Sequence, residues 1–283
     1  MDGDAEYQRP HLVTWDSVCY SKKEGGLGVK NAGMWNVATV GKLVNWIYTK
    51  ADRLWVLWID HIYMKGVDWS SYIPPPDSNW NWRNICKVKG MLATGFQGNH
   101  WISDARGYSI NAGYQWLQSS HPHVPWYKDV WDSWNVPKQS VIGWLIQRKA
   151  LNTRVKMAQL RISDNNSCVM CELGPETHAH TFSDCVYSNL VVTNIELWLQ
   201  MSLQTLPGRC STIRRKVWRV VRLSCWYMLW TERNKCRIDM NIRRPELLVS
   251  EIQKVAQMRI QHKLNFPIQQ SDVIWITSLG IHV

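Results

Sequence analysis

Residues 168 to 185 read Cys168-Val-Met-Cys171-Glu-Leu-Gly-Pro-Glu-Thr-His-Ala-His180-Thr-Phe-Ser-Asp-Cys185. This segment has the pattern C-x2-C-x8-H-x4-C and gathers three thiols and an imidazole. Zinc takes four sulfur or nitrogen ligands at the corners of a tetrahedron, and Cys3His is a standard structural set. The Cys-x2-Cys turn directs two sulfurs at one ion, and a Gly-Pro turn returns the chain with the second pair. We therefore predict one structural zinc ion bound by Cys168, Cys171, His180 and Cys185.

Two histidines compete for the fourth ligand position. His180 gives an H-x4-C arm similar to that of retroviral zinc knuckles, and His178 gives H-x6-C. We favour His180 and expect His178 to be a solvated loop residue beside Glu176. A catalytic zinc site, with Glu176 as general base, is disfavoured because four protein ligands leave no open position for water. Without secretory features, the other cysteines are expected to be free thiols: Cys19, Cys86, Cys210, Cys225 and Cys236.

The same segment resembles the zinc-binding domain downstream of the reverse transcriptase in plant non-LTR retrotransposons. That family runs roughly C-x-x-C, E-T, H-L-F-F and C, and here the Glu-Thr pair is Glu176-Thr177. Thr181 replaces the usual leucine and Ser183 the second aromatic residue. The ligand positions of the family pattern are therefore kept while two packing positions differ.

Further landmarks of the family occur in family order from about residue 12 to residue 235. They are Val13-Thr14-Trp15-Asp16 with Cys19, Lys23-Glu24-Gly25-Gly26-Leu27-Gly28, Asn79-Trp80-Asn81-Trp82-Arg83, Val136-Pro137-Lys138-Gln139-Ser140 with Trp144, Leu151-Asn152-Thr153-Arg154, and Trp230-Thr231-Glu232-Arg233-Asn234. Ser21 stands where the family has proline. The resemblance implies that the intact polyprotein is an RNA-directed DNA polymerase and that this part helps to hold template RNA or target DNA.

The chain lacks the acidic residues that such a polymerase needs. The family's palm holds two Mg²⁺ ions with an Asp-Asp motif, and no Asp-Asp pair occurs in this sequence. Nucleotide transfer with two metals requires carboxylates clustered around both ions. No acidic set typical of an endonuclease or ribonuclease H is recognisable either. We therefore expect a non-catalytic C-terminal fragment of the polyprotein, with no small-molecule substrate.

Hydrophobic spacing predicts a mainly helical, Trp-rich fold. Apolar residues recur at intervals of three and four over residues 27–64, 126–162, 189–203, 212–238 and 246–264. Three consecutive prolines, Pro74 to Pro76, predict an extended linker. The glycine-dotted, alternating stretch from Lys87 to Gly113 predicts a small β-hairpin, and the tail at 273–276 predicts a strand or apolar coil.

We divide the chain into four parts on this basis. Residues 1–75 form a post-polymerase helical segment and residues 76–107 a linker with short strands. Residues 108–195 form the reverse transcriptase zinc-binding domain, and residues 196–283 a basic helical region. No run of 18 apolar residues exists, so no membrane span is expected. The acidic, polar start is unlike a signal or transit peptide, so we expect an intracellular protein, and the family suggests the nucleus.

The positive charge is concentrated in one short stretch. The chain has a formal net charge of +11, and residues 209–244 hold 11 basic and 2 acidic residues, a net of +9. Arg215, Arg219 and Arg222 share one face of the predicted helix. Phosphate contact with RNA or DNA requires such charge but no base-specific geometry. The predicted contacts are Arg214, Arg215, Lys216, Arg219, Arg222, Arg233, Lys235 and Arg237.

The basic face and the tryptophans each allow a second interpretation. The basic face could be solvated, or it could lie on a membrane surface. The chain has 19 tryptophans and 3 phenylalanines; tryptophan usually packs in cores and interfaces, although it can also stack on bases. The alternative function is a zinc-stabilised module in which tryptophan-rich faces bind a protein partner.

Overall fold

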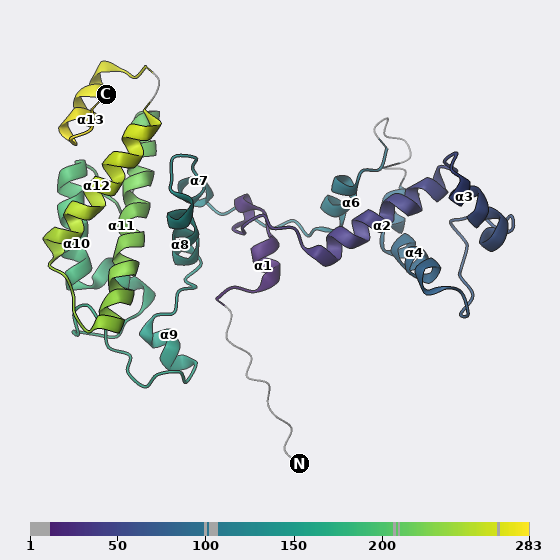
Figure 1. The fold of residues 1–283 in the computed structure, drawn as a ribbon, viewed down its shortest axis with the longest axis horizontal. Helices are drawn as coiled ribbons and strands as arrows, with labels where there is room; N and C mark the ends of the chain where they lie inside the picture. Colours follow the sequence, from purple (N-terminus) through teal and green to yellow (C-terminus); the bar gives the residue numbers. More distant parts are fainter. Residues whose placement is uncertain are drawn as a thin grey trace, which may run out of the picture. The chain divides into compact units, whose positions relative to one another are not determined.

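The computed structural model describes residues 12–98, 101, 107–205, 208, 210–264 and 267–282 (Figure 1). The chain forms two compact units, one of residues 27–122 and the other of residues 1–26 with 123–283. The described residues form helices and no β-strand, apart from an isolated bridge between Ser167 and Pro175. The mainly helical prediction is therefore confirmed. None of the described helices is long and apolar enough to cross a bilayer.

The unit of residues 27–122 is built around one long helix. Helix α2 spans Ala32–Tyr48 and begins at Asn31, whose side chain accepts a hydrogen bond from the Met34 amide. It packs against α4 (Trp80–Met91) and α6 (Ile110–Leu117). The other elements of this unit are α3 (Leu54–Ile59), the π-turn η2 (Asp60–Met64) and α5 (Ala93–Gln97). Pro74 to Pro76 lie inside this unit.

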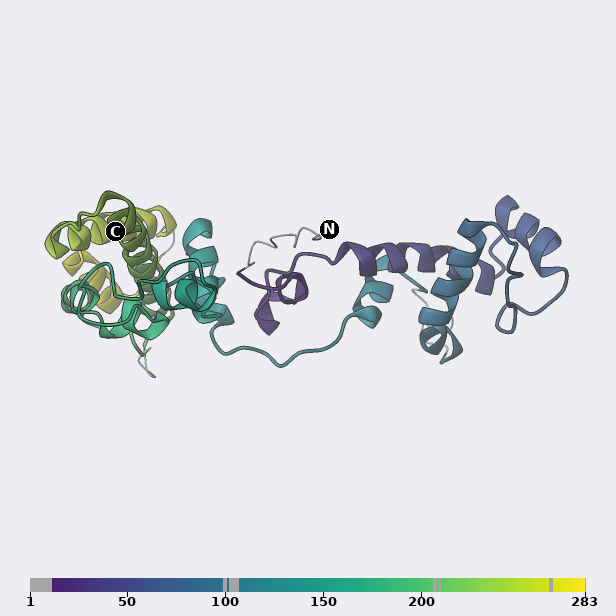
Figure 2. The same cartoon turned by 90° about the horizontal axis from the view of Figure 1, so that it is seen from below.

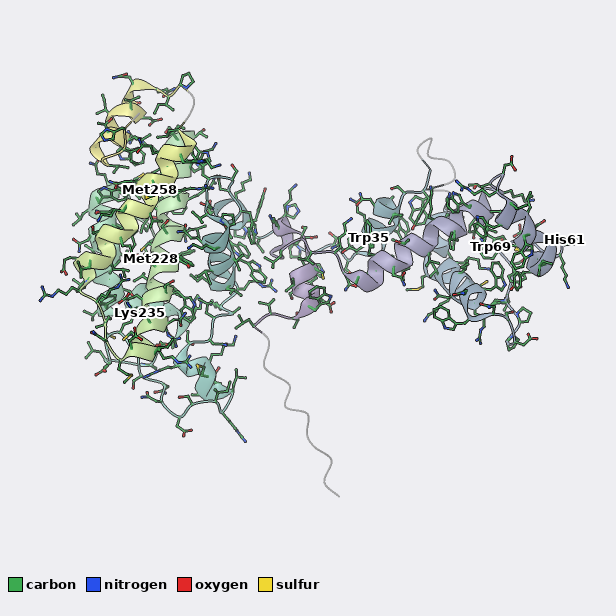
Figure 3. The ribbon with its side chains drawn as sticks, in the orientation of Figure 1. Trp35, His61, Trp69, Met228, Lys235 and Met258 are labelled. Atoms are coloured by element: carbon green, nitrogen blue, oxygen red, sulfur yellow. The ribbon has the colours of Figure 1, made fainter. Side chains whose placement is uncertain are left out.

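Aromatic side chains fill the core of this unit. Tyr48 stacks on Phe96 with ring centroids 4.7 Å apart, and Trp69 lies 5.6 Å from Trp82. The Trp82 indole donates a hydrogen bond to the Tyr72 hydroxyl at 3.1 Å. Figure 3 labels Trp69 and, toward the other end of α2, Trp35. Buried indoles of this kind act as core packing residues and are not available for base stacking.

The hairpin predicted from Lys87 to Gly113 is wrong for the described residues, which form the end of α4, α5 and the start of α6 and contain no strand. The glycines allow aromatic rings to approach the helices closely. A Cβ at Gly95 would overlap the Trp101 ring, and one at Gly113 would overlap the Tyr108 hydroxyl. That hydroxyl donates to the Ala38 carbonyl oxygen at 2.6 Å. Residues 99, 100 and 102–106 of the predicted hairpin lie outside the described residues.

The second unit is a helical bundle whose centre is α11. Its elements are α1 (Trp15–Cys19), η1 (Lys22–Glu24), α7 (Tyr127–Val130), α8 (Pro137–Gln147), α9 (Arg154–Gln159), η3 (His180–Asp184), α10 (Val186–Leu199), α11 (Thr212–Asp239), α12 (Pro245–Lys263) and α13 (Gln270–Ser278). Helix α11 packs against α8, α10 and α12, as the two views of Figures 1 and 2 agree. Being enclosed on several sides, it buries apolar residues along most of its length.

The C-terminal tail is helical, contrary to the expected strand or coil. Trp275 and Ile276 of α13 are buried, and the Trp275 indole donates to the Leu199 carbonyl oxygen at 3.3 Å. Asp272 in the first turn pairs with Arg214 of α11 at 3.1 Å. These tertiary contacts outweigh the weak helix propensity of the β-branched residues in the tail.

Candidate metal centre

A tight turn presents the first two cysteines. The bridge between Ser167 and Pro175 closes the loop, and the Cys168 amide donates to the Gly174 carbonyl oxygen at 2.7 Å. The Glu172 amide donates to the Cys168 carbonyl oxygen at 2.9 Å, and Glu172 has a φ of 60°. This left-handed residue turns the chain directly after Cys171. The turn thereby places both sulfurs on the same side of the loop.

A π-turn presents the histidine and the third cysteine. Element η3 spans His180–Asp184, and the Cys185 amide donates to the His180 carbonyl oxygen at 2.8 Å. A hydrogen bond between residues five apart closes one wide helical turn, which suits the H-x4-C spacing. The Thr181 hydroxyl donates to the Thr177 carbonyl oxygen at 2.9 Å. Threonine at the family's leucine position thus braces the turn.

The four ligand atoms form a compact group. All lie within 4.8 Å of one another, with 3.9 Å between the sulfurs of Cys168 and Cys185 and 3.2 Å between the Cys171 sulfur and His180 Nε2. Zinc–sulfur bonds of about 2.3 Å at tetrahedral angles place two sulfurs about 3.8 Å apart. Cys168 and Cys185 are fully buried, and the other two are half-buried. The donor set and its spacing fit zinc.

The buried thiols affect each other's ionisation. The hydrogen bond to Cys185, together with burial, raises the pKa of Cys168, and the same hydrogen bond lowers the pKa of Cys185. Thiolates, not thiols, bind zinc, so metal binding at this group releases protons. Affinity for zinc should therefore fall as the pH is lowered.

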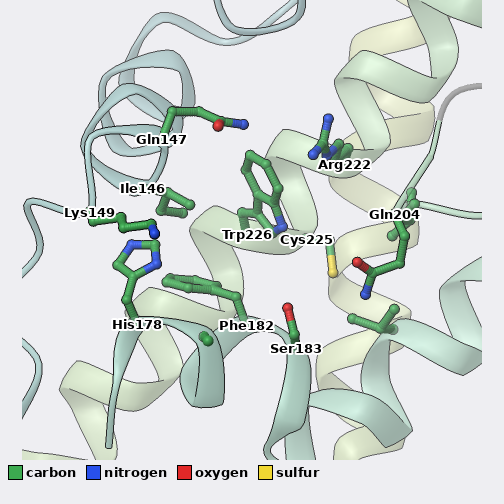
Figure 4. Close-up of a pocket in the computed structure, with 13 residues that line it drawn as sticks. Ile146, Gln147, Lys149, His178, Phe182, Ser183, Gln204, Arg222, Cys225 and Trp226 are labelled. Atoms are coloured by element: carbon green, nitrogen blue, oxygen red, sulfur yellow. The ribbon is translucent and has the colours of Figure 1, made fainter. Parts of the chain in front are cut away.

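His178 lies outside this group. Its ring lines a cavity of about 240 Å³ and packs on Phe182, with ring centroids 5.2 Å apart (Figure 4). Ile146, Lys149 and Trp226 line the same cavity. Burial lowers the pKa of His178, which favours the neutral ring. The expectation of a solvated loop residue is wrong, because the adjoining π-turn directs this side chain inward.

Alanine at position 180 is expected to remove zinc from the purified protein, and alanine at position 178 is expected to retain one equivalent. The reason is that only the His180 ring lies beside the Cys171 sulfur. Metal content by mass spectrometry measures both variants. If His180→Ala retains zinc and His178→Ala loses it, the zinc ligand is His178 and not His180.

Glu176 anchors the metal loop to α11. Its fully buried carboxylate pairs with the equally buried Arg233, and its Oε1 accepts hydrogen bonds from Arg233 Nε at 3.0 Å and from the Arg154 amide at 2.8 Å. The Val169 amide donates to Oε2 at 3.4 Å. A carboxylate held by these donors is not free to act as a general base. The Glu176–Arg233 ion pair therefore joins three stretches that were singled out in the sequence. They are residues 151–154, 176–177 and 230–234.

Several of the predicted phosphate contacts are paired inside the protein. Arg214 pairs with Asp272, Arg219 with Asp129 and Asp132, Arg222 with Asp129, and Arg233 with Glu176. Arg215 and Lys216 are half-buried, whereas Lys235 and Arg237 are exposed; Figure 3 labels Lys235. The face shared by Arg219 and Arg222 carries ion pairs because aspartates of a distant segment pack against it. Sequence spacing could not reveal those partners.

Comparison with known proteins identifies part of the chain. Residues 108–191 match the family described as zinc-binding in reverse transcriptase. A protein of Arabidopsis thaliana named "Putative ribonuclease H protein At1g65750" is 39% identical over 84 residues, which are 29% of this chain and 13% of that protein. The chain thus spans a small part of this relative's length. No solved structure matches the chain.

Residues 108–191 of the chain therefore carry the zinc-binding domain of this reverse transcriptase family. The matched residues include all four members of the Cys/His group. Zinc is the cofactor of this domain, because the matched family is described as zinc-binding and the Cys/His group suits that ion.

Proposed function

We propose that the chain is a non-catalytic C-terminal part of a retroelement reverse transcriptase polyprotein that uses structural zinc to hold a nucleic-acid-binding bundle in shape. The zinc ligands in this proposal are Cys168, Cys171, His180 and Cys185. The observation that carries it is the group of four donor atoms within 4.8 Å of one another, in a stretch that matches a zinc-binding family. Four protein ligands close the zinc shell, which supports a structural role.

The bundle's charge supports binding to RNA or DNA. Phosphate backbones attract exposed cations whatever the base sequence. Of the cations predicted on α11, Lys235 and Arg237 are exposed near its C-terminal end. The arginines paired with carboxylates have their charge balanced within the protein, so the exposed cations are the better candidates for phosphate contact.

Binding to a single-stranded oligonucleotide is expected to weaken steeply with salt. With about five phosphate contacts, log K against log salt should slope by roughly −3.5, taking about −0.7 per contact. Replacing Lys235 and Arg237 with glutamine should flatten the slope by about 1.4. Fluorescence anisotropy measures both slopes. The matched control replaces exposed lysines of the other unit, Lys50 and Lys65, and should leave the slope unchanged.

A zinc-stabilised protein-interaction module is the second candidate, and an exposed apolar face favours it. On the short helix α3, Leu54 is 85% exposed, Leu57 58% and Trp58 54%. Apolar docking depends little on salt, whereas phosphate binding is governed by it. An affinity for nucleic acid that does not change with salt, or that the Lys235 and Arg237 double variant leaves unaltered, would support this second function instead.

A further inference from the structure

Three distant segments of the zinc-containing unit meet at an open pocket of about 450 Å³. It combines lysines with aromatic rings, and neither its position nor its composition was predicted from the sequence. The lining residues are Lys22, Lys23, Tyr127, Lys128, Trp131, Asp132, Ser133 and Arg219. They come from η1, from α7 and the turn after it, and from α11.

A rigid turn positions Lys22 and Lys23. The Ser21 hydroxyl accepts from the Glu24 amide at 3.3 Å, and the Glu24 carboxylate accepts from the Ser21 amide at 3.2 Å, which forms a capping box around η1. Serine therefore caps the turn where the family pattern has proline. Gly26 is required because a Cβ there would overlap the Tyr20 carbonyl oxygen.

The rest of the unit holds this turn against α7. The Val124 amide donates to the Lys23 carbonyl oxygen at 2.9 Å, and the Trp144 indole donates to the Gly25 carbonyl oxygen at 2.8 Å. From α11, Arg219 pairs with Asp129 and Asp132, each at 2.9 Å. The pocket walls are thus fixed by hydrogen bonds and ion pairs.

Unpaired positive charge lies beside aromatic rings in this pocket. Lys22, Lys23 and Lys128 are exposed, and no carboxylate in the described part of the chain forms an ion pair with them. The Lys22 ammonium lies 4.8 Å from the centroid of the Trp131 ring, and the Lys128 ammonium 5.8 Å from that of Tyr127. The aspartate that lines the pocket, Asp132, and the neighbouring Asp129 both pair with Arg219, so the three lysine charges remain in excess.

We propose that this pocket binds single-stranded RNA or DNA, with phosphates at the three lysine ammonium groups and bases against the rings of Tyr127 and Trp131. Binding of single strands without sequence preference combines a cationic groove with aromatic stacking. Stacking accepts any base because every base has a π face. This inference rests on the proposed function and assigns its main binding surface to the lysines and aromatic rings of η1 and α7 and the turn after α7, where Arg219 of α11 is held by its ion pairs.

The test uses the full chain and a fluorescein-labelled oligouridylate or oligothymidylate of about twelve nucleotides, within the usual range of site sizes. The triple variant Lys22→Gln, Lys23→Gln, Lys128→Gln should flatten the salt slope by about 2 and weaken binding on the order of 100-fold at about 0.1 M salt. Tyr127→Leu should weaken binding about tenfold with little change of slope, because it removes stacking and no charge. Zinc content should stay at one equivalent in each variant.

A control variant separates local from general charge effects. Replacing Lys50, Lys65 and Lys87, exposed lysines of the other unit, with glutamine makes the same change in net charge and should leave affinity near that of the wild type. Photocrosslinking of a 5-bromouridine oligonucleotide should label the segment of residues 127–131. If the pocket and control variants lose affinity equally, or if the pocket variant binds as the wild type does, the pocket is not the binding site, although the proposed function still stands. Absence of salt-dependent binding by the wild-type chain would overturn the proposed function itself.

Discussion

Serine at position 171 is expected to abolish zinc binding and to disorder the loop of residues 166–185. Removing one thiolate leaves three ligands, and structural zinc contributes about 10–16 kcal/mol of apparent binding energy in small finger peptides. Two amide hydrogen bonds report directly on the loop, those from Cys168 to Gly174 and from Glu176 to Asn166, both 2.7 Å. Hydrogen exchange at these amides should speed up in the variant, and metal analysis should find less than a tenth of the wild-type zinc.

The control for this variant is another half-buried cysteine. Cys210 is a free thiol outside the Cys/His group and is half-buried, as Cys171 is. Cys210→Ser should keep one equivalent of zinc and wild-type exchange in the loop. Helix α11 packs on α8, α10 and α12 through its own buried residues, so most of the helical circular dichroism should persist without zinc. A Cys171→Ser protein that still holds one equivalent would refute the ligand assignment.

The helices of the bundle were predictable because their signals are local. Apolar spacing predicted residues 212–238 as a helix, and α11 spans Thr212–Asp239. Apolar spacing also predicted a helix over residues 246–264, and α12 spans Pro245–Lys263 with the proline at its first position. Where periodicity, caps and prolines agree, the sequence alone locates an element.

Features that depend on distant partners were not predictable. The stretch around Gly95 and Gly113 suggested turns, yet these glycines make room for Trp101 and Tyr108. The cationic face of α11 suggested a free surface, yet Asp129 and Asp132 lie more than eighty residues away in sequence and pair with Arg219. The pocket lysines carried no local signal because Lys22 and Lys128 meet only through tertiary structure.

The Cys/His group stands between these extremes. Ligand spacing is encoded within eighteen residues, so the four candidates could be chosen from the sequence. The choice between His178 and His180 depends on the π-turn, in which the ring of one faces Cys171 and the ring of the other faces Phe182. The partner of Glu176 could not be inferred, because Arg233 is 57 residues away along the chain.

Glutamine at position 176 is expected to lower the free energy of unfolding of the zinc-containing unit by about 3 kcal/mol. Glutamine keeps the shape of the side chain but leaves the Arg233 guanidinium, 1% exposed, without its counter-charge. Breaking a buried pair by removing one partner costs about 3–5 kcal/mol. The urea midpoint measures the loss. Glu172→Gln is the matched control: this carboxylate belongs to the same loop but is exposed, so its change should stay within about 0.5 kcal/mol.

A double-mutant cycle separates the lost ion pair from lost packing. Arg233→Met removes the buried cation and should destabilise on its own, because Glu176 then lacks its partner. With both changes present, no unpaired charge remains, so the double variant should be more stable than the sum of the single losses by about 1–3 kcal/mol. The glutamine carbonyl oxygen can replace only one of the two carboxylate oxygens, so it can keep the 2.8 Å bond from the Arg154 amide, and the weak 3.4 Å bond from the Val169 amide is lost. That loss is the same in Glu176→Gln and in the double variant, so it cancels from the coupling between positions 176 and 233. Additive losses would mean that Glu176 and Arg233 stabilise the loop independently, and that the ion pair does not couple the metal loop to α11.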